Sequence, residues 1–242
     1  MQKSNFKKDE VLVKIRNLHK YFYTGKRTIY ALRGVDLDIY EKDFVVIFGP
    51  SGCGKSTLLN LILGIDKPTK GRVEIKGVNI FKLSEDERAT FRAQRIGTIY
   101  QMSYWVKSLT ALENVALPLV IKGIKSYFAL RRAEDIMEKM GIGDLKNQIP
   151  TQLSGGEQQK VGLARAIVVN PLIIIADEPT GNLDSKAGRE VMKILEYLNK
   201  EEERTIILVT HNEEYWDYGK RRVEMKDGKI IKEENHGYRI SA

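Results

Sequence analysis

The stretch of sequence that most constrains the fold is Gly49 to Thr57, which reads Gly-Pro-Ser-Gly-Cys-Gly-Lys-Ser-Thr. It fits G-x-x-x-x-G-K-[ST], the pattern of a phosphate-binding loop between a strand and a helix. The apolar run Phe44 to Phe48 predicts that strand, and Ser56 to Leu63 predicts a helix ended by Gly64. The helix N-terminus would offer free N–H groups and a positive dipole end to an anion. Because this context lies on both sides of the motif, an ordinary glycine-rich turn is the weaker interpretation.

Each part of the loop has a chemical reason. Gly52 and Gly54 let the backbone approach the phosphates without a Cβ in the way. Lys55 would reach the terminal phosphates, and the Ser56 hydroxyl would ligate magnesium. The expected nucleotide-binding residues of this loop are Gly49, Pro50, Ser51, Gly52, Cys53, Gly54, Lys55, Ser56 and Thr57.

The composition is that of a globular protein. Of 242 residues, 42% are apolar and 30% are charged, which suits one large domain or one domain carrying a smaller subdomain. No run of about 18 apolar residues appears, so no membrane span is expected. Cys53 is the only cysteine, which excludes an intramolecular disulfide and favours a reducing compartment. The net charge of +8 suits nucleic acid, an anionic membrane or a nucleotide, and it does not select among them because it is spread along the chain.

Two alternating segments predict an antiparallel sheet near the N-terminus. Apolar residues alternate with polar ones over 11–15 and 35–39, as in half-exposed strands. Tyr21, Phe22 and Tyr23 are expected between these strands, followed by a turn. Tyr21 could stack on a purine ring or pack in the core, and the residues alone favour core packing.

Two carboxylates follow a buried strand. The run Leu172 to Ala176 predicts the strand, and Asp177 and Glu178 come directly after it. Ligands bind at the carboxyl ends of strands in open α/β sheets. Asp177 would hold magnesium, and Glu178 would orient or deprotonate an attacking water. The alternative is a solvated acidic turn.

Gln101 and His211 also stand at the ends of predicted strands, 96–100 and 205–210. The amide oxygen of Gln101 could reach magnesium or a water. The imidazole of His211 could contact a γ-phosphate. Each residue alone is a weak signal.

The chain after Gln101 is expected to be mostly helical. Thr110 and Glu113 form a capping box for a helix to about Ile121, and 126–140 predicts a longer helix. Consecutive helices without a strand suggest a helical subdomain inserted into an α/β domain.

A second anion site is predicted at Leu153 to Glu157. Ser154 caps the next helix, and Gly155 and Gly156 leave its N-terminus free of side chains. Asp184 caps a further helix. One compact domain rarely needs two phosphate sites.

The C-terminal part predicts a hairpin. The segments 222–225 and 229–232 would pair across the Asp227-Gly228 turn. From Glu233 onward a frayed tail is expected.

In this order, the motifs resemble the ATP-binding subunit of ABC transporters over residues 10 to 232. The resemblance implies an α/β P-loop NTPase fold of ABC ATPase type, with a mainly parallel core sheet, an N-terminal antiparallel β subdomain and an inserted helical subdomain. It implies a single domain over 1–242. The nucleotide-binding core would cover about 10–98 and 170–232, and the helical subdomain with the signature segment about 102–168.

The resemblance also implies roles for residues. Tyr21 becomes the adenine-stacking residue, which reverses the interpretation drawn from the residues alone. Each ATP would lie between the phosphate loop of one subunit and the Ser154–Glu157 segment of a second copy. The implied catalytic residues are Glu178, His211 and Lys55, the implied magnesium ligands are Ser56, Gln101 and Asp177, and the further nucleotide contacts are Gln101, Ser154, Gly155, Gly156, Glu157 and Asp184.

Within the family, 109–115 and 176–184 look like the clade of macrolide exporters, lipoprotein-release ATPases and the cell-division ATPase FtsE. This implies an integral membrane permease in a separate chain, of the MacB, LolD or FtsX kind, received by 102–109 and the helical insert. It also implies a peripheral position on the cytoplasmic side of the plasma membrane and no nucleic acid partner. The stretch 104–107 departs from the clade's leucine-rich pattern. The alternative is a soluble ABC ATPase acting on DNA, ribosomes or iron-sulfur assembly, which the lack of a tandem domain, coiled coil or cysteine cluster disfavours.

Overall fold

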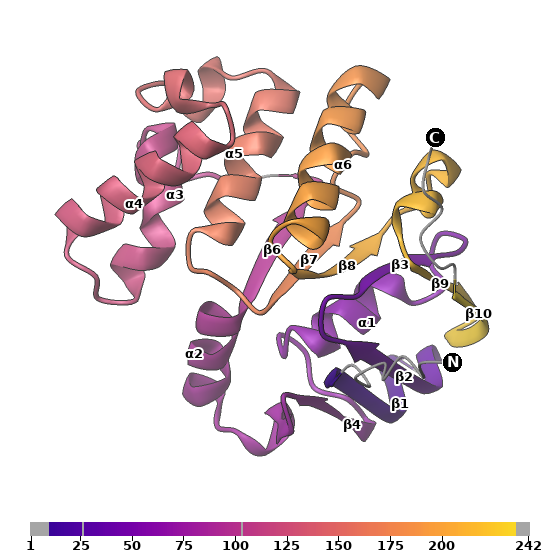
Figure 1. Cartoon of the computed structure of the whole chain (residues 1–242). Coiled ribbons are helices and arrows are strands. Elements are labelled where there is room, and N and C mark those ends of the chain that lie inside the picture. The colour runs from indigo at the N-terminus through magenta and orange to yellow at the C-terminus, as the bar shows by residue number, and fades with distance from the viewer. Residues whose placement is uncertain (1–9, 26, 103, 236–242) are drawn as a thin grey trace, which may run out of the picture.

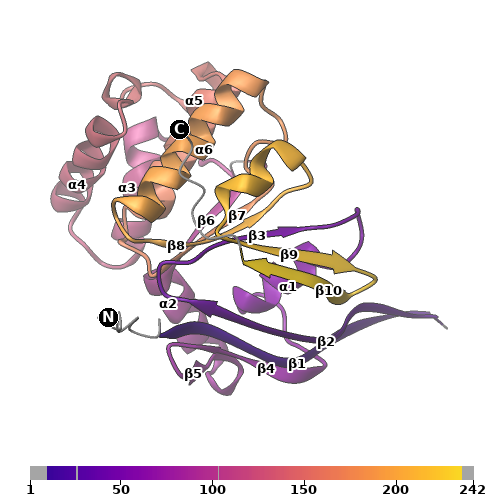
Figure 2. The same cartoon turned by 45° about the vertical axis from the view of Figure 1, so that its right-hand side comes forward.

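The computed structural model describes residues 10–25, 27–102 and 104–235, and it arranges them as two sheets and a group of helices (Figures 1 and 2). The strands are β1 (Val11–Thr24), β2 (Arg27–Tyr40), β3 (Phe44–Phe48), β4 (Lys70–Ile75), β5 (Val78–Asn79), β6 (Ile96–Tyr100), β7 (Ile173–Asp177), β8 (Thr205–Val209), β9 (Arg221–Lys226) and β10 (Lys229–Asn235). The α-helices are α1 (Lys55–Ile62), α2 (Glu85–Arg95), α3 (Ala111–Ile121), α4 (Ser126–Lys139), α5 (Gly155–Ile167) and α6 (Ser185–Lys200).

The larger sheet has the strand order β10-β9-β3-β8-β7-β6, and only β9 and β10 pair antiparallel. Every residue of β3 and β8 is buried, as expected for parallel strands covered on both faces. Alternate residues of β3 face opposite sides: Val45 and Ile47 pack with α1 and the second sheet, whereas Phe44 and Val46 pack with α5 and α6. The predicted α/β fold with a mainly parallel core sheet is confirmed.

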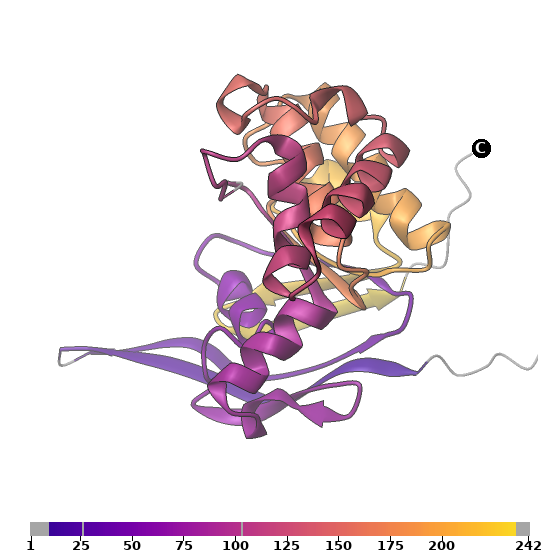
Figure 3. The same ribbon diagram turned by 90° about the vertical axis from the view of Figure 1, so that its left-hand side faces the viewer.

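The smaller sheet is antiparallel, in the order β2-β1-β4-β5. The prediction of two short strands with the aromatic residues between them was wrong. Pairing continues from Val11↔Tyr40 to Thr24↔Arg27 across several irregularities, so Tyr21 to Tyr23 lie within β1. Aromatic and β-branched residues on both strands favour this extension. The hairpin projects from the body of the molecule (Figure 3).

Three helices, α3, α4 and α5, pack around a hydrophobic cluster separate from the two clusters beside the large sheet. A capping box begins α3 at Thr110, as the sequence predicts, and the predicted cap of α5, Ser154, also proves to be part of a capping box. In α4 the buried residues are Ala129, Ala133 and Met137, four apart and therefore on one face. These helices form the inserted group that the sequence predicts, while its boundaries at 102 and 168 stay a prediction.

The chain after Lys232 differs from the prediction of a frayed tail. Strand β10 continues to Asn235, and Glu233 pairs with Val223 across the ladder. The buried Arg221 guanidinium explains this order, because it forms ion pairs with both Asp43 and Glu233. In the ranges described, no helix is both long enough and apolar enough to cross a membrane.

Candidate nucleotide-binding site

The predicted functional residues follow strands whose carboxyl ends lie in one row. Asp177 pairs with Tyr100 on one side and with Val209 on the other, and Val209 pairs with Ile47. The phosphate loop, Gln101, Glu178 and His211 therefore leave the sheet at the same edge, where ligands bind in open parallel sheets.

The phosphate loop requires glycine at two positions for lack of space. A Cβ on Gly49 would lie 2.1 Å from the carbonyl oxygen of Met225, and one on Gly54 would lie 2.4 Å from that of Ala31. Both residues have positive φ, 146° and 110°. Helix α1 starts at Lys55, and none of the described side chains caps it. The first N–H groups of α1 are thus placed to bind an anion.

Lys55 lies over this loop. Its side chain is buried, and its Nζ donates to the carbonyl oxygens of Gly49 and Pro50 at 2.8 and 3.1 Å. The same ammonium is 3.9 Å from Cys53 Sγ. A lysine held against the concave side of the loop is placed to contact the outer phosphates of a nucleotide.

The turn between β9 and β10 supports the loop from outside. The N–H of Gly228 donates to the carbonyl oxygen of Cys53 at 3.0 Å, and the Arg33 N–H donates to the Gly228 carbonyl at 2.8 Å. The sequence predicts the turn but not this contact. No sequence signal could have found it, because hydrogen bonds between distant backbone groups leave no residue pattern.

Asp177 has the environment of a magnesium ligand. Burial raises its pKa, neighbouring Glu178 raises it further, and the hydrogen bond from the Ser56 hydroxyl and the charge of Lys55 oppose the rise. The Ser56 hydroxyl and the Asp177 carboxylate meet at the start of α1 and offer oxygen ligands, which magnesium prefers. The donor set therefore fits the cofactor that the sequence implies.

Glu178 and His211 lie next to each other. The Nδ1 atom of His211 is 2.9 Å from Oε2 of Glu178, and the backbone N–H of His211 also donates to that oxygen at 3.3 Å. The Glu178 side chain is 18% exposed and that of His211 is 71% exposed. Glu178 has a φ of 49°, in the left-handed region that non-glycine residues seldom adopt and that often marks functional sites. Its backbone N–H donates to Val209, which fixes this turn.

Two further predicted residues have less direct placements. Gln101 donates from its amide nitrogen to Oδ1 of Asn182 at 3.1 Å, so it contacts the loop that follows Glu178. Tyr21 is partly exposed, and its ring centroid lies 5.6 Å from those of Tyr23 and Tyr30. This position of Tyr21 does not distinguish between core packing and adenine stacking.

The Ser154 segment forms a separate site. Ser154 and Glu157 make a reciprocal capping box, in which the Ser154 N–H donates to Glu157 at 2.8 Å. This hydrogen bonding lowers the pKa of Glu157. A recess of about 330 Å³ opens beside the segment, and it is lined by Ser154, Gly155, Gly156, Glu157, Lys160, Asn182, Leu183, Asp184, Lys186, Ala187 and Glu190. None of the nine residues from Gly49 to Thr57 lines it, so this chain alone does not join its two predicted anion sites.

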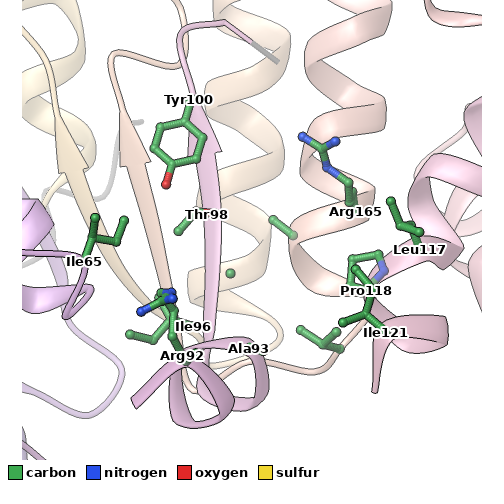
Figure 4. A pocket seen from close by; sticks show the side chains of 14 residues that line it. Ile65, Arg92, Ala93, Ile96, Thr98, Tyr100, Leu117, Pro118, Ile121 and Arg165 are labelled. Atoms are coloured by element: carbon green, nitrogen blue, oxygen red, sulfur yellow. The ribbon is translucent and has the colours of Figure 1, made fainter. Parts of the chain in front are cut away.

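A groove of about 360 Å³ lies between α2, β6, α3 and α5 (Figure 4). Its walls include Ile65, Arg92, Tyr100, Leu117, Pro118, Ile121 and Arg165.

Side chains of α3 and α5 hold the segment 104–106 in place beside this groove. Trp105 donates to Gln158 of α5 at 3.1 Å, and Arg165 lies 4.5 Å over the Trp105 ring while donating to the Tyr104 carbonyl. The buried Asn114 side chain holds the same segment from α3, bonding to Val106 at both its N–H and its carbonyl. The sequence does not predict these roles of Trp105, Arg165 and Asn114, although its departure from the clade's pattern at 104–107 lies at the same place.

Comparisons with known proteins agree with the geometry. The family model described as ABC transporter matches residues 32–181. The lipoprotein-releasing system ATP-binding protein LolD of Syntrophus aciditrophicus is 40% identical over 220 residues, which cover 91% of this chain and 99% of LolD. The macrolide export ATP-binding/permease protein MacB of Aggregatibacter actinomycetemcomitans is 44% identical over 91% of this chain, but the match covers 34% of MacB.

A solved structure extends the similarity to the fold. The cassette MJ0796 of Methanocaldococcus jannaschii, a dimer in a post-hydrolysis state bound to ADP and Pi, has a TM-score of 0.86 and 42% identity. The match covers 94% of this chain and all of that one. The predicted family is confirmed: this chain belongs to the ABC transporter ATP-binding proteins and is an ATP-binding ATPase subunit.

Proposed function

We propose that this chain hydrolyses ATP between two copies of itself and thereby drives a separately encoded membrane permease of the MacB, LolD or FtsX kind. The observation that carries the proposal is the separation of the two anion sites. The Ser154–Glu157 recess has the cap and glycines of a phosphate site, yet it lacks the phosphate loop. A second copy related by a two-fold axis would complete both sites with one pair of surfaces.

In this proposal the residues at the strand ends divide the work. The loop N–H groups and Lys55 bind the phosphates, and Tyr21 stacks on the adenine. Ser56, Asp177 and Gln101 would hold magnesium, which would neutralise charge on the phosphate oxygens. Glu178 orients the attacking water and accepts its proton, and His211 both positions that carboxylate and contacts the γ-phosphate. Ser154 to Glu157 of the second copy, with Asp184, close the site.

The groove between α2, α3 and α5 is the surface proposed for the permease. The core sheet lines one side of this groove and the helical group lines the other. A permease segment bound there would therefore contact both, and its binding would depend on their relative position. The relatives reported above are transport proteins by name, which does not favour the alternative of action on DNA, ribosomes or iron-sulfur assembly. The proposed location is peripheral, on the cytoplasmic side of the plasma membrane, with no nucleic acid partner.

Glu178→Gln tests the proposal. The variant should bind ATP normally, lose turnover by about a hundredfold or more, and remain a dimer with ATP, because removal of the base blocks the step that separates the copies. Light scattering after size exclusion, with and without ATP, measures the dimer. Lys55→Ala is the control that should stay monomeric with ATP. A monomeric Glu178→Gln protein at saturating ATP would contradict the shared site.

A further inference from the structure

The turn between α3 and α4 exposes an unusual number of large apolar side chains. Ile121, Tyr127 and Phe128 are 72%, 67% and 61% exposed. Val120 and Ile124 are also among the exposed large hydrophobic residues. We call residues 120–131 the α3–α4 corner.

These side chains do not contribute to the core of the helical group. The buried residues of α4 are Ala129, Ala133 and Met137, on the face that packs against α3 and α5. Tyr127 and Phe128 instead contact each other edge to face, with ring centroids 5.4 Å apart. The pair therefore adds an ordered apolar surface that the fold itself does not need.

The charged residues of the corner itself have one sign. From Asn114 to Ala133 the chain contains no carboxylate, and its cations are Lys122, Lys125, Arg131 and Arg132. In the part of the chain that the structure describes, neither Lys122 nor Lys125 lies within ion-pair distance of a carboxylate. Both lysines are exposed, one at each side of the turn.

We propose that the α3–α4 corner contacts an anionic membrane surface, with Tyr127 and Phe128 among the headgroups and Lys122 and Lys125 on lipid phosphates. Aromatic rings favour the interface between membrane and water, and lysines near an anionic leaflet are attracted to it. Exposed rings and cations occur together in the corner, and residues 120–131 contain no acid. A surface of this kind binds an anionic lipid surface better than rings or cations alone would.

The position of the corner agrees with this partner. Ile121 belongs to the corner and also lines the groove proposed for the permease, so the two surfaces are continuous. A permease segment in the groove would hold the corner toward the membrane. The inference goes beyond the proposed function, because vesicle binding requires neither ATP nor a permease.

Flotation with lipid vesicles tests the inference on the full chain. The protein should float with vesicles of phosphatidylcholine and phosphatidylglycerol but not with phosphatidylcholine alone, and binding should weaken with salt. Each of Lys122→Gln and Lys125→Gln should weaken binding about fivefold. Tyr127→Ser combined with Phe128→Ser should weaken it by about tenfold or more.

The matched controls lie on α6, where Tyr197→Ser removes another exposed ring and Lys193→Gln another exposed cation. These variants should bind vesicles as wild type does, and all variants should keep basal ATPase activity. Equal binding to neutral and anionic vesicles, or unchanged binding of the double variant, would overturn the inference. If the corner bound a permease protein in detergent and did not bind vesicles, the inference would also be overturned, and the corner would be a protein-binding surface instead. In each case the proposed function would still be tested separately, by the ATPase activity.

Discussion

Asp177 is a residue whose environment suits a ligand rather than the stability of the unliganded chain. Its folded-state pKa lies above the ordinary value of 3.8, mainly because the carboxylate is buried. The folded protein then binds this proton more tightly than the unfolded chain does. Stability therefore falls as pH rises from 3.8 through the raised pKa, and the loss persists at neutral pH.

Asp177→Asn should remove this cost. Without nucleotide or magnesium at neutral pH, we expect the variant to be more stable by about 1 kcal/mol, which is a rise in melting temperature of about 2–4 °C. The gain should shrink as pH is lowered toward 4, where wild type also loses the charge. Thermal melts across pH measure it, with the exposed Asp135→Asn as control. Magnesium-dependent turnover should fall; a variant less stable than wild type at neutral pH would contradict the account.

At the scale of elements, α3 depends on one amide to hold the segment before it. Asn114 is fully buried, and its Nδ2 donates to the carbonyls of Val106, Leu109 and Thr110 at 3.0–3.1 Å. Its Oδ1 accepts the Val106 N–H. One side chain thus provides hydrogen-bond partners for the backbone of the irregular stretch 104–110, which precedes the helical group.

Asn114→Ala should loosen that stretch. We expect a loss of about 2 kcal/mol of stability, because the Val106 N–H and the Leu109 carbonyl would lose the partner that Asn114 provides, whereas the carbonyls of Val106 and Thr110 keep backbone partners. Hydrogen exchange should rise over 104–110 more than in the core sheet, and thermal melts give the overall loss. The exposed Asn147→Ala should change neither. Unchanged exchange at 104–110 would show that Trp105 and Arg165 suffice.

The elements themselves were largely predictable from sequence, and their long-range contacts were not. Capping residues such as Thr110 and Ser154 marked helix starts because cap and helix are neighbours in the chain. The outer pairs of the β1–β2 hairpin, such as Tyr21↔Tyr30, were missed although they are close in sequence. The order of the strand after Lys232, by contrast, depends on Arg221, which is itself held by Asp43, 178 residues away. Local patterns carry no record of such partners. For the same reason the strand-end residues of the candidate site could be named from the sequence, while the contact of Gly228 with the phosphate loop could not.

At the scale of the whole molecule, the phosphate loop is completed by residues from both ends of the described chain. Gly228 lies between Cys53 and Arg33 in a chain of backbone hydrogen bonds. Its φ is 77°, and a Cβ there would lie 2.7 Å from the Ala31 carbonyl oxygen. The support of the loop is thus a tertiary contact rather than a property of the motif.

Gly228→Ala should weaken ATP binding by about tenfold, equivalent to about 1.4 kcal/mol, by pushing the turn away from the loop. Gly77→Ala is a matched control, because Gly77 has a φ of 75° in a similar turn and nothing within 4 Å of its Cβ position. Both variants bear the cost of an unfavourable φ, and only Gly228→Ala should change affinity in a titration with a fluorescent ATP analogue. Equal affinities in the two variants would mean that the turn does not support the loop.

The place of β3 in the sheet has a consequence for synthesis on the ribosome. Strand β3 carries the phosphate loop, and its neighbours β8 and β9 are made more than 150 residues later. Until they emerge, the apolar β3 has no sheet to join and Cys53 has no Gly228 to bind. A nascent chain therefore displays the whole nucleotide motif long before it can hold a nucleotide, and its apolar β3 is prone to aggregation until β8 and β9 have been made.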